Sequence, residues 1–140
     1  MPRHAADRVL LAPVPDVWTF LADPYNLADW WPGISGVEPD RRGLAPGARW
    51  KVLGPDQPTY FRKPQMTGTL LVLDVVPMQR VAFQLTGDRI EAELTLRPAE
   101  DDRTEASLVV EAPFLIGLRR RFPVDALARL HALLRTSEEP

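Results

Sequence analysis

The stretch from residue 9 to residue 33 constrains the fold of this 140-residue chain more than any other part of the sequence. Pro15 fits the first position of a helix, where its missing N–H group is not needed, and Asp16 favours the positive end of the helix dipole. Asp23 precedes a proline, which pushes it out of helical geometry, yet its carboxylate can cap a new helix over 24–31. The sequence therefore predicts two short helices in direct succession, after a strand over 4–11.

Both predicted helices carry an apolar face. In the first, apolar residues recur at spacings of three and four, which indicates one buried stripe. The second places Leu27 and either Trp30 or Trp31 on one side. Neither helix can bury such a face by itself, so both are expected to pack on a larger apolar surface. The stripe of the first helix consists of Val14, Val17, Trp18 and Leu21, with Phe20 at its edge.

The rest of the chain reads as strands and one long helix. Segments over 34–40, 49–53, 66–76, 80–86, 90–96 and around 106–110 have strand composition, and the last three alternate apolar and polar residues. Glu91 and Glu93 are therefore expected on the solvent-facing side of the sheet. The shared apolar face requires a cover, which the C-terminal segment supplies: Leu127, Leu130, His131 and Leu134 recur at helical spacing. Pro123 either kinks one long helix or starts a helix of about 13 residues after it.

Length and composition exclude several classes of protein. A chain of this length is expected to form a single domain, residues 1–140. A net charge of −2 argues against nucleic-acid binding. With no cysteine, and with His4 and His131 as the two histidines, neither a metal site nor a cofactor is expected. No apolar run is long enough to span a membrane and the start lacks a signal peptide, so a cytoplasmic protein is expected, for which a homodimer is left open.

The same stretch carries a resemblance to a known superfamily. The matching residues are Ala12-Pro13 after the first strand, Val17-Trp18 in the first helix, Asp23-Pro24 between the two helices and Trp30-Trp31-Pro32-Gly33 at the end of the second helix. It resembles the opening of a START-like, Bet v 1-like (SRPBCC) domain, and is most similar to the polyketide cyclase/dehydrase branch. Weaker matches follow at 47–50 and 75–83. The resemblance implies an α+β helix-grip fold, in which a curved antiparallel sheet of six or seven strands wraps around a long C-terminal helix, with two short helices between strands one and two.

This fold predicts a cavity between the sheet and the C-terminal helix, in which a small hydrophobic or aromatic molecule, lipid-like or polyketide-like, is expected to bind. Burial of apolar area would drive binding, and one or two polar groups would orient the ligand. His131 interrupts an apolar helix face and is either a hydrogen-bonded structural residue or a general base. Asp7 or Arg8 faces inward, depending on the register. The expected lining residues are Trp30, Trp50, Tyr60, Phe83, Leu127, His131 and Leu134, with Met66 and Leu94 as further candidates.

Two other functions fit the same sequence. The resemblance to polyketide cyclases implies that some relatives guide aldol condensation and dehydration of a bound chain, but the sequence shows no matching catalytic set. Related folds also include co-chaperone domains resembling the Hsp90 ATPase activator, which would require a filled interior and an exposed apolar patch.

Tyr60 and Phe61 lie in the proline-rich segment 54–64, which has the composition of a loop over an opening.

Overall fold

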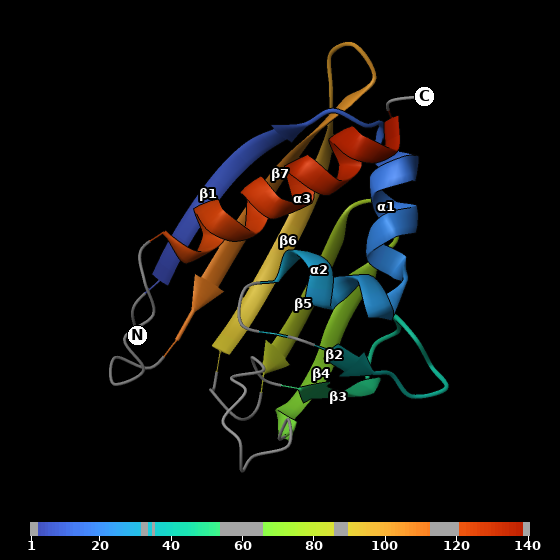
Figure 1. Ribbon diagram of the computed structural model, residues 1–140, viewed down its shortest axis with the longest axis vertical. Coiled ribbons are helices and arrows are strands. Elements are labelled where there is room, and N and C mark those ends of the chain that lie inside the picture. Colours follow the sequence, from blue (N-terminus) through green and yellow to red (C-terminus); the bar gives the residue numbers. More distant parts are fainter. Residues whose placement is uncertain are drawn as a thin grey trace, which may run out of the picture.

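One antiparallel sheet of seven strands supports all the helices of the structure (Figure 1). The computed structural model describes residues 3–31, 34, 36–53, 66–85, 90–112 and 121–138. The strands are ordered β1-β7-β6-β5-β4-β3-β2 across the sheet. In chain order the elements are β1 (Arg3–Leu10), α1 (Val14–Ala22), η1 (Pro24–Asn26), α2 (Leu27–Trp30), β2 (Gly36–Glu38), β3 (Arg49–Leu53), β4 (Met66–Val76), β5 (Arg80–Leu85), β6 (Ile90–Ala99), β7 (Arg103–Glu111) and α3 (Phe122–Glu138).

The two predicted helices between the first strands form by the expected local chemistry. Pro15 lies in the first turn of α1. The carboxylate of Asp23 accepts a hydrogen bond from the backbone N–H of Tyr25 at 3.1 Å and so caps the next element. The expected helix over 24–31 divides into the 3₁₀ turn η1 and the short helix α2. Two direction changes within a few residues thus bring α1 and α2 onto the same side of the sheet (Figure 1).

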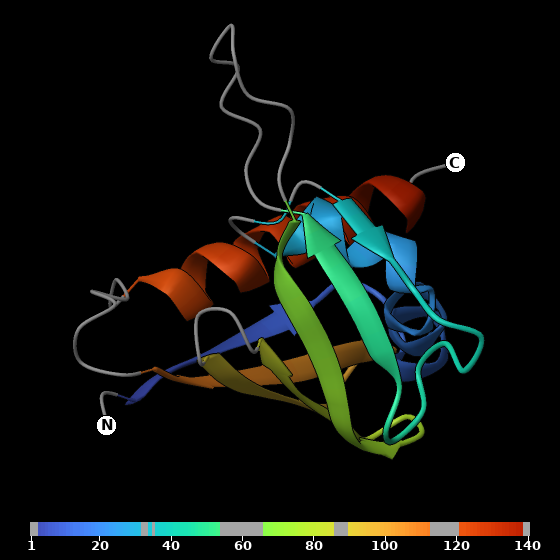
Figure 2. The same ribbon diagram turned by 90° about the horizontal axis from the view of Figure 1, so that it is seen from below.

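The sheet curves around α3, which lies across its inner face (Figure 2). Alternating residues of β5, β6 and β7 are buried on that face, as their sequence pattern predicted. The register pairs Leu10 with Thr104 and Arg8 with Ala106, so Arg8 and not Asp7 shares the inner face. Its side chain is nevertheless exposed, because β1 is an edge strand of the sheet. The α+β helix-grip architecture is therefore confirmed.

The C-terminal helix is longer than the sequence suggested. It spans 17 residues and begins at Phe122, so Pro123 lies in its first turn, where a missing N–H group costs nothing. Ala126, Leu127, Leu130 and Leu134 are buried and form the side of α3 that faces the sheet. No helix in the described part of the chain is long and apolar enough to cross a membrane.

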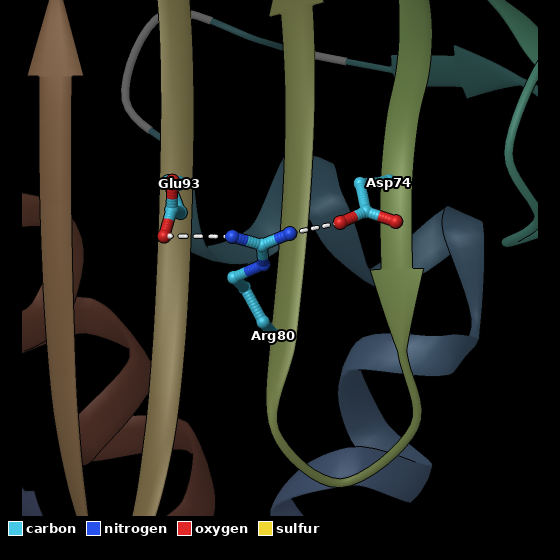
Figure 3. Close-up of polar contacts among 3 residues, drawn as sticks. All are labelled: Asp74, Arg80 and Glu93. Carbon is cyan, nitrogen blue, oxygen red and sulfur yellow. Dashed lines mark hydrogen bonds and ion pairs between the residues drawn. The ribbon is translucent and has the colours of Figure 1, made fainter.

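A bulge in β4 decides which of its residues face outward. The register pairs Val72 with Phe83 and Asp74 with Ala82, so one extra residue is accommodated between them. Without the bulge, alternation after Leu70 and Val72 would turn Asp74 into the apolar interior. Figure 3 shows the outcome: Arg80 of β5 lies between Asp74 of β4 and Glu93 of β6 and contacts both.

This outer-face contact links three neighbouring strands. The Arg80 guanidinium donates a hydrogen bond to the Asp74 carboxylate, and its Nη1 lies 3.6 Å from Oε1 of Glu93. The hydrogen bond to Asp74, with the charges of Asp74 and Glu93, raises the pKa of Arg80 further above its ordinary value. All three side chains are partly exposed, so the network contributes modestly to stability.

Candidate functional site

An apolar cavity lies between the helices α1 and α2 and the strands β3, β4 and β5. Its volume is about 20 Å³. Its described walls are aliphatic and aromatic side chains and contain no acid or base. The described lining residues are Leu21, Leu27, Trp30, Leu44, Trp50, Leu70, Val72, Val81 and Phe83.

The cavity is small compared with the ligands that a helix-grip domain is expected to hold. A volume of 20 Å³ admits about one water-sized sphere. An apolar cavity that binds benzene in another protein measures roughly 150 Å³. As the described residues bound it, this cavity is therefore too small for an organic molecule, and a ligand would fit there only if a wall moved.

The structure brings together three of the residues predicted to line the cavity. Trp30, Trp50 and Phe83 all contribute to its wall. Leu127 and Leu134 are buried in the core under α3, and His131 is half-buried on the same helix. These three are not among the described residues lining this cavity. Tyr60 and the side chain of Met66 lie outside the described residues, and Leu94 is fully buried in the core.

Trp31 connects the cavity wall to the rest of the core. Its side chain is 1 % exposed. Its ring lies 5.5 Å from that of Trp30, 5.1 Å from that of Phe83 and 5.0 Å from that of Phe122, centroid to centroid. All three contacts are edge-to-face, the geometry that aromatic quadrupoles favour. One side chain thus joins α2, β5 and α3.

The loop over residues 40–48, between β2 and β3, closes one side of the cavity through Leu44. The Asp40 carboxylate holds both ends of this 40–48 loop, because its oxygens accept hydrogen bonds from the backbone N–H groups of Arg42 and Arg49, each at 2.9 Å. Trp50 holds its middle, since the indole N–H donates to the carbonyl oxygen of Gly43 at 2.9 Å. Leu44, the next residue in the chain, is thereby held in the wall of the cavity.

We expect the Asp40 carboxyl group to titrate below the usual range. The hydrogen bond from the Arg49 backbone N–H, then that from Arg42 and the positive charge of Arg42, lower the pKa of Asp40. A carboxyl group with a lowered folded-state pKa stabilises the fold above its unfolded pKa, and this contribution is lost as pH falls through the folded value. The loop contacts should therefore persist at neutral pH and weaken below about pH 4. A carboxyl-detected NMR titration measures this, and a midpoint at or above the usual value would contradict it.

A second hollow, of about 260 Å³, lies on the outer face of the sheet and is exposed to solvent. Its described lining residues include Arg3, Glu91, Glu93 and Glu111 together with apolar residues such as Ala82. Glu111 lies 3.8 Å from Arg3, and Glu93 contacts Arg80, so two of the carboxylates have cationic neighbours. Within the described residues, no group of three or more acidic or histidine side chains is arranged to hold a metal ion.

Sequence reasoning missed the cavity's loop wall. Leu44 lies in a segment without periodicity, so nothing marked it as buried. A signal was nevertheless present, because Asp40 followed by Gly43 and Gly47 is typical of a turn in which an aspartate caps the backbone. Both glycines adopt positive φ, 62° at Gly43 and 86° at Gly47. That backbone region is rare for other residues.

Several solved structures have a fold similar to that of this chain. The chain superposes on XoxI from Bacillus cereus with a TM-score of 0.74 at 12% identity, covering 100% of both chains. It superposes on NE0264 from Nitrosomonas europaea with a TM-score of 0.72 at 19% identity, covering 99% of this chain and 97% of that one. The chain also superposes on BexL, a di-domain ARO/CYC protein of the BE-7585A biosynthetic pathway, with a TM-score of 0.69 at 18% identity. This superposition covers 100% of the present chain but 48% of BexL.

The sequence itself assigns the family. A comparison with curated proteins gives no match. The model of one protein family, described as polyketide cyclase / dehydrase and lipid transport, matches residues 1–135. Because this match spans nearly the whole chain and the helix-grip architecture agrees with it, the protein belongs to the polyketide cyclase/dehydrase and lipid transport family.

Proposed function

We propose that this domain binds a small hydrophobic or aromatic molecule, lipid-like or polyketide-like, between its helices and its curved sheet. The observation that carries the proposal is that the described part of the cavity wall consists of aliphatic and aromatic side chains, with rings from Trp30, Trp50 and Phe83. Such a wall favours ligands that gain free energy by leaving water, at about 25 cal/mol per Å² of apolar area buried. Membership of a family described by lipid transport and polyketide chemistry supports the same class of ligand.

Binding is preferred over catalysis because of what the described wall contains. General acid–base chemistry needs a titratable group within hydrogen-bond reach of the reacting atom. Among the described lining residues there is none, and the one indole N–H whose partner is known, that of Trp50, is occupied by the Gly43 carbonyl. A cyclase or dehydrase activity is therefore kept as an outcome of the test and not as a second proposal.

Native mass spectrometry of the purified chain, with and without a mixture of lipids and aromatic metabolites, tests the proposal. A retained small mass supports binding. A changed ligand mass indicates chemistry instead, and a stable complex with another protein and no small mass would favour an interaction module. Absence of any retained mass, across ligands of increasing size, would refute binding.

The lining assignment is tested by comparing two tryptophan variants. Trp50→Ala is expected to weaken the binding of a neutral fluorescent probe, N-phenyl-1-naphthylamine, by about 1–3 kcal/mol, a 5- to 150-fold rise in Kd, because one wall is removed. Trp18→Ala is the matched control, since Trp18 packs on the core from α1 without lining the cavity. Equal affinities in both variants would contradict the assignment.

Loss of a buried tryptophan can unfold a domain, so a gentler pair accompanies this comparison. Val72→Ala shortens a cavity wall, whereas Val17→Ala shortens a buried side chain of α1 outside it. Circular dichroism confirms that each variant is folded before its Kd is measured. Only Val72→Ala should change the affinity.

A further inference from the structure

Among the described residues lining the cavity, Leu44 differs from the others in its setting. The remaining eight lie in α1, α2, β3, β4 and β5, where regular hydrogen bonds hold the backbone. Leu44 belongs to the 40–48 loop, which has neither helix nor strand. A cavity of this size can admit a ligand only if a wall moves, and among the described walls the one with the fewest backbone hydrogen bonds is the least costly to move.

The attachments of this loop are few and identifiable. Its last residues are paired with β4, because the N–H of Gly47 donates to Val72 O at 2.8 Å and the N–H of Val72 donates to Ala48 O at 2.9 Å. Before Gly47, the loop is held by side-chain contacts of Asp40, Trp50 and Arg42, whose Nη1 lies 3.3 Å from Gly47 O. Two turn hydrogen bonds add to these, from Gly43 N–H to Asp40 O at 3.4 Å and from Ala48 N–H to Ala45 O at 3.0 Å. The contacts of Asp40 and Arg42 are exposed, so water can replace them when they break.

The backbone of the loop is suited to movement between these attachments. Gly43 and Gly47 both adopt positive φ and lie on either side of Leu44. A Cβ at Gly43 would meet no atom within 4 Å, so this residue is not wedged against its neighbours. Rotation at these two glycines would carry Leu44 outward while the ladder between β3 and β4 stays paired.

We propose that the 40–48 loop is the gate of the apolar cavity, with Leu44 as the side chain that closes it and the Asp40 carboxylate as the latch. This inference rests on the proposed function, because a gate requires a ligand to admit. The ligand would enter at this end of the sheet, between the walls formed by Leu21 and Leu27 of the helices and by Val72 and Val81 of the strands. Opening exposes one aliphatic side chain and breaks the hydrogen bond from the Trp50 indole to Gly43 O, but it leaves the pairing between β3 and β4 intact.

Probe-binding kinetics distinguish a gate from a fixed wall. Asp40→Asn weakens the latch without touching the cavity, since Asp40 is exposed and does not line it. Stopped-flow mixing with N-phenyl-1-naphthylamine should show the association and dissociation rate constants both raised about 5- to 10-fold, with Kd changed less than 2-fold. Asp102→Asn, which removes an exposed carboxylate from the turn between β6 and β7, is the matched control and should leave both rates unchanged. Unchanged rates in Asp40→Asn would overturn the gate.

Amide hydrogen exchange of the ligand-free chain answers the same question without a probe. The amides of Arg42, Gly43 and Arg49 should be at least 100-fold less protected than those of Val72 and Phe83, and Asp40→Asn should lower the loop values a further 5- to 10-fold. Equal protection of loop and sheet would overturn the gate whether or not a ligand binds. If the loop opens but no probe binds at any concentration, the proposed function fails and the gate fails with it as a ligand entrance, whereas binding with a rigid loop refutes only the gate.

Discussion

Replacing Trp31 by alanine is expected to lower the free energy of unfolding by about 3–5 kcal/mol. The side chain is 1 % exposed, so its removal leaves a cavity that backbone shifts only partly fill. It also ends three edge-to-face contacts, each worth roughly 0.5–1.5 kcal/mol beyond the area that it buries. Because these contacts join α2, β5 and α3, the variant should lose cooperativity between helices and sheet. Chemical denaturation measures the change, and thermal unfolding should shift by roughly 10 °C or more.

A conservative variant and a distant one control this experiment. Trp31→Phe keeps an aromatic ring and should recover part of the loss. Tyr25→Ala removes an aromatic side chain that is 65% exposed, and should change the free energy of unfolding by no more than about 0.5 kcal/mol. A Trp31→Ala variant as stable as Tyr25→Ala would show that Trp31 does not have the connecting role described for it.

Replacing Phe83 by alanine is expected to have a comparable cost, about 3–5 kcal/mol, and to create a binding site in return. Phe83 is 4 % exposed and lines the apolar cavity, so the space of its ring adds to the 20 Å³ already present. The enlarged void would be lined by aliphatic and aromatic groups, the kind of cavity that stays dry and accepts benzene. Benzene at about ten times its Kd should then restore roughly 1.4 kcal/mol of the lost stability.

The natural chain and a matched phenylalanine variant provide the reference. Phe20→Ala removes a half-buried ring of α1 that packs on the core without lining the cavity. Benzene should raise the unfolding midpoint of Phe83→Ala and leave that of Phe20→Ala unchanged. A Phe83→Ala variant that loses stability but gains nothing from benzene would mean that its walls collapse, which would count against the cavity as a ligand site.

Much of the fold could be predicted because local signals and alternation agreed. Pro15 and Asp23 place the two short elements after β1, and the segment 49–53 was correctly read as a strand. Boundaries were less accurate, since β2 is shorter than its apolar segment and α3 is longer than its periodic one. The bulge near Asp74 was missed because it is set by the register of β4 on β5, which no single segment encodes.

The site was harder to predict than the fold. The position of Trp30, Trp50 and Phe83 in the cavity wall could be predicted, because large aromatic residues on inward faces meet wherever a curved sheet and its helices approach each other, whereas their role in binding stays a prediction. The volume between them depends on how exactly the side chains fill space, and single methylene groups decide that. Leu44 could not be identified from periodicity, since its burial results from a hydrogen bond between Trp50 and a backbone carbonyl of the loop.

The position of β1 at the edge next to β7 has a consequence for the synthesis of this protein. Leu10 pairs with Thr104 and Arg3 with Glu111, so the first strand has no neighbour in the sheet until more than ninety further residues have been made. The hydrogen bond that the buried hydroxyl of Thr104 donates to Ala12 O, at 2.8 Å, likewise forms late. On a ribosome, the growing chain carries its first apolar segments without a partner, and the domain completes its fold only after nearly all of it has been released, as expected of a topology dominated by distant contacts.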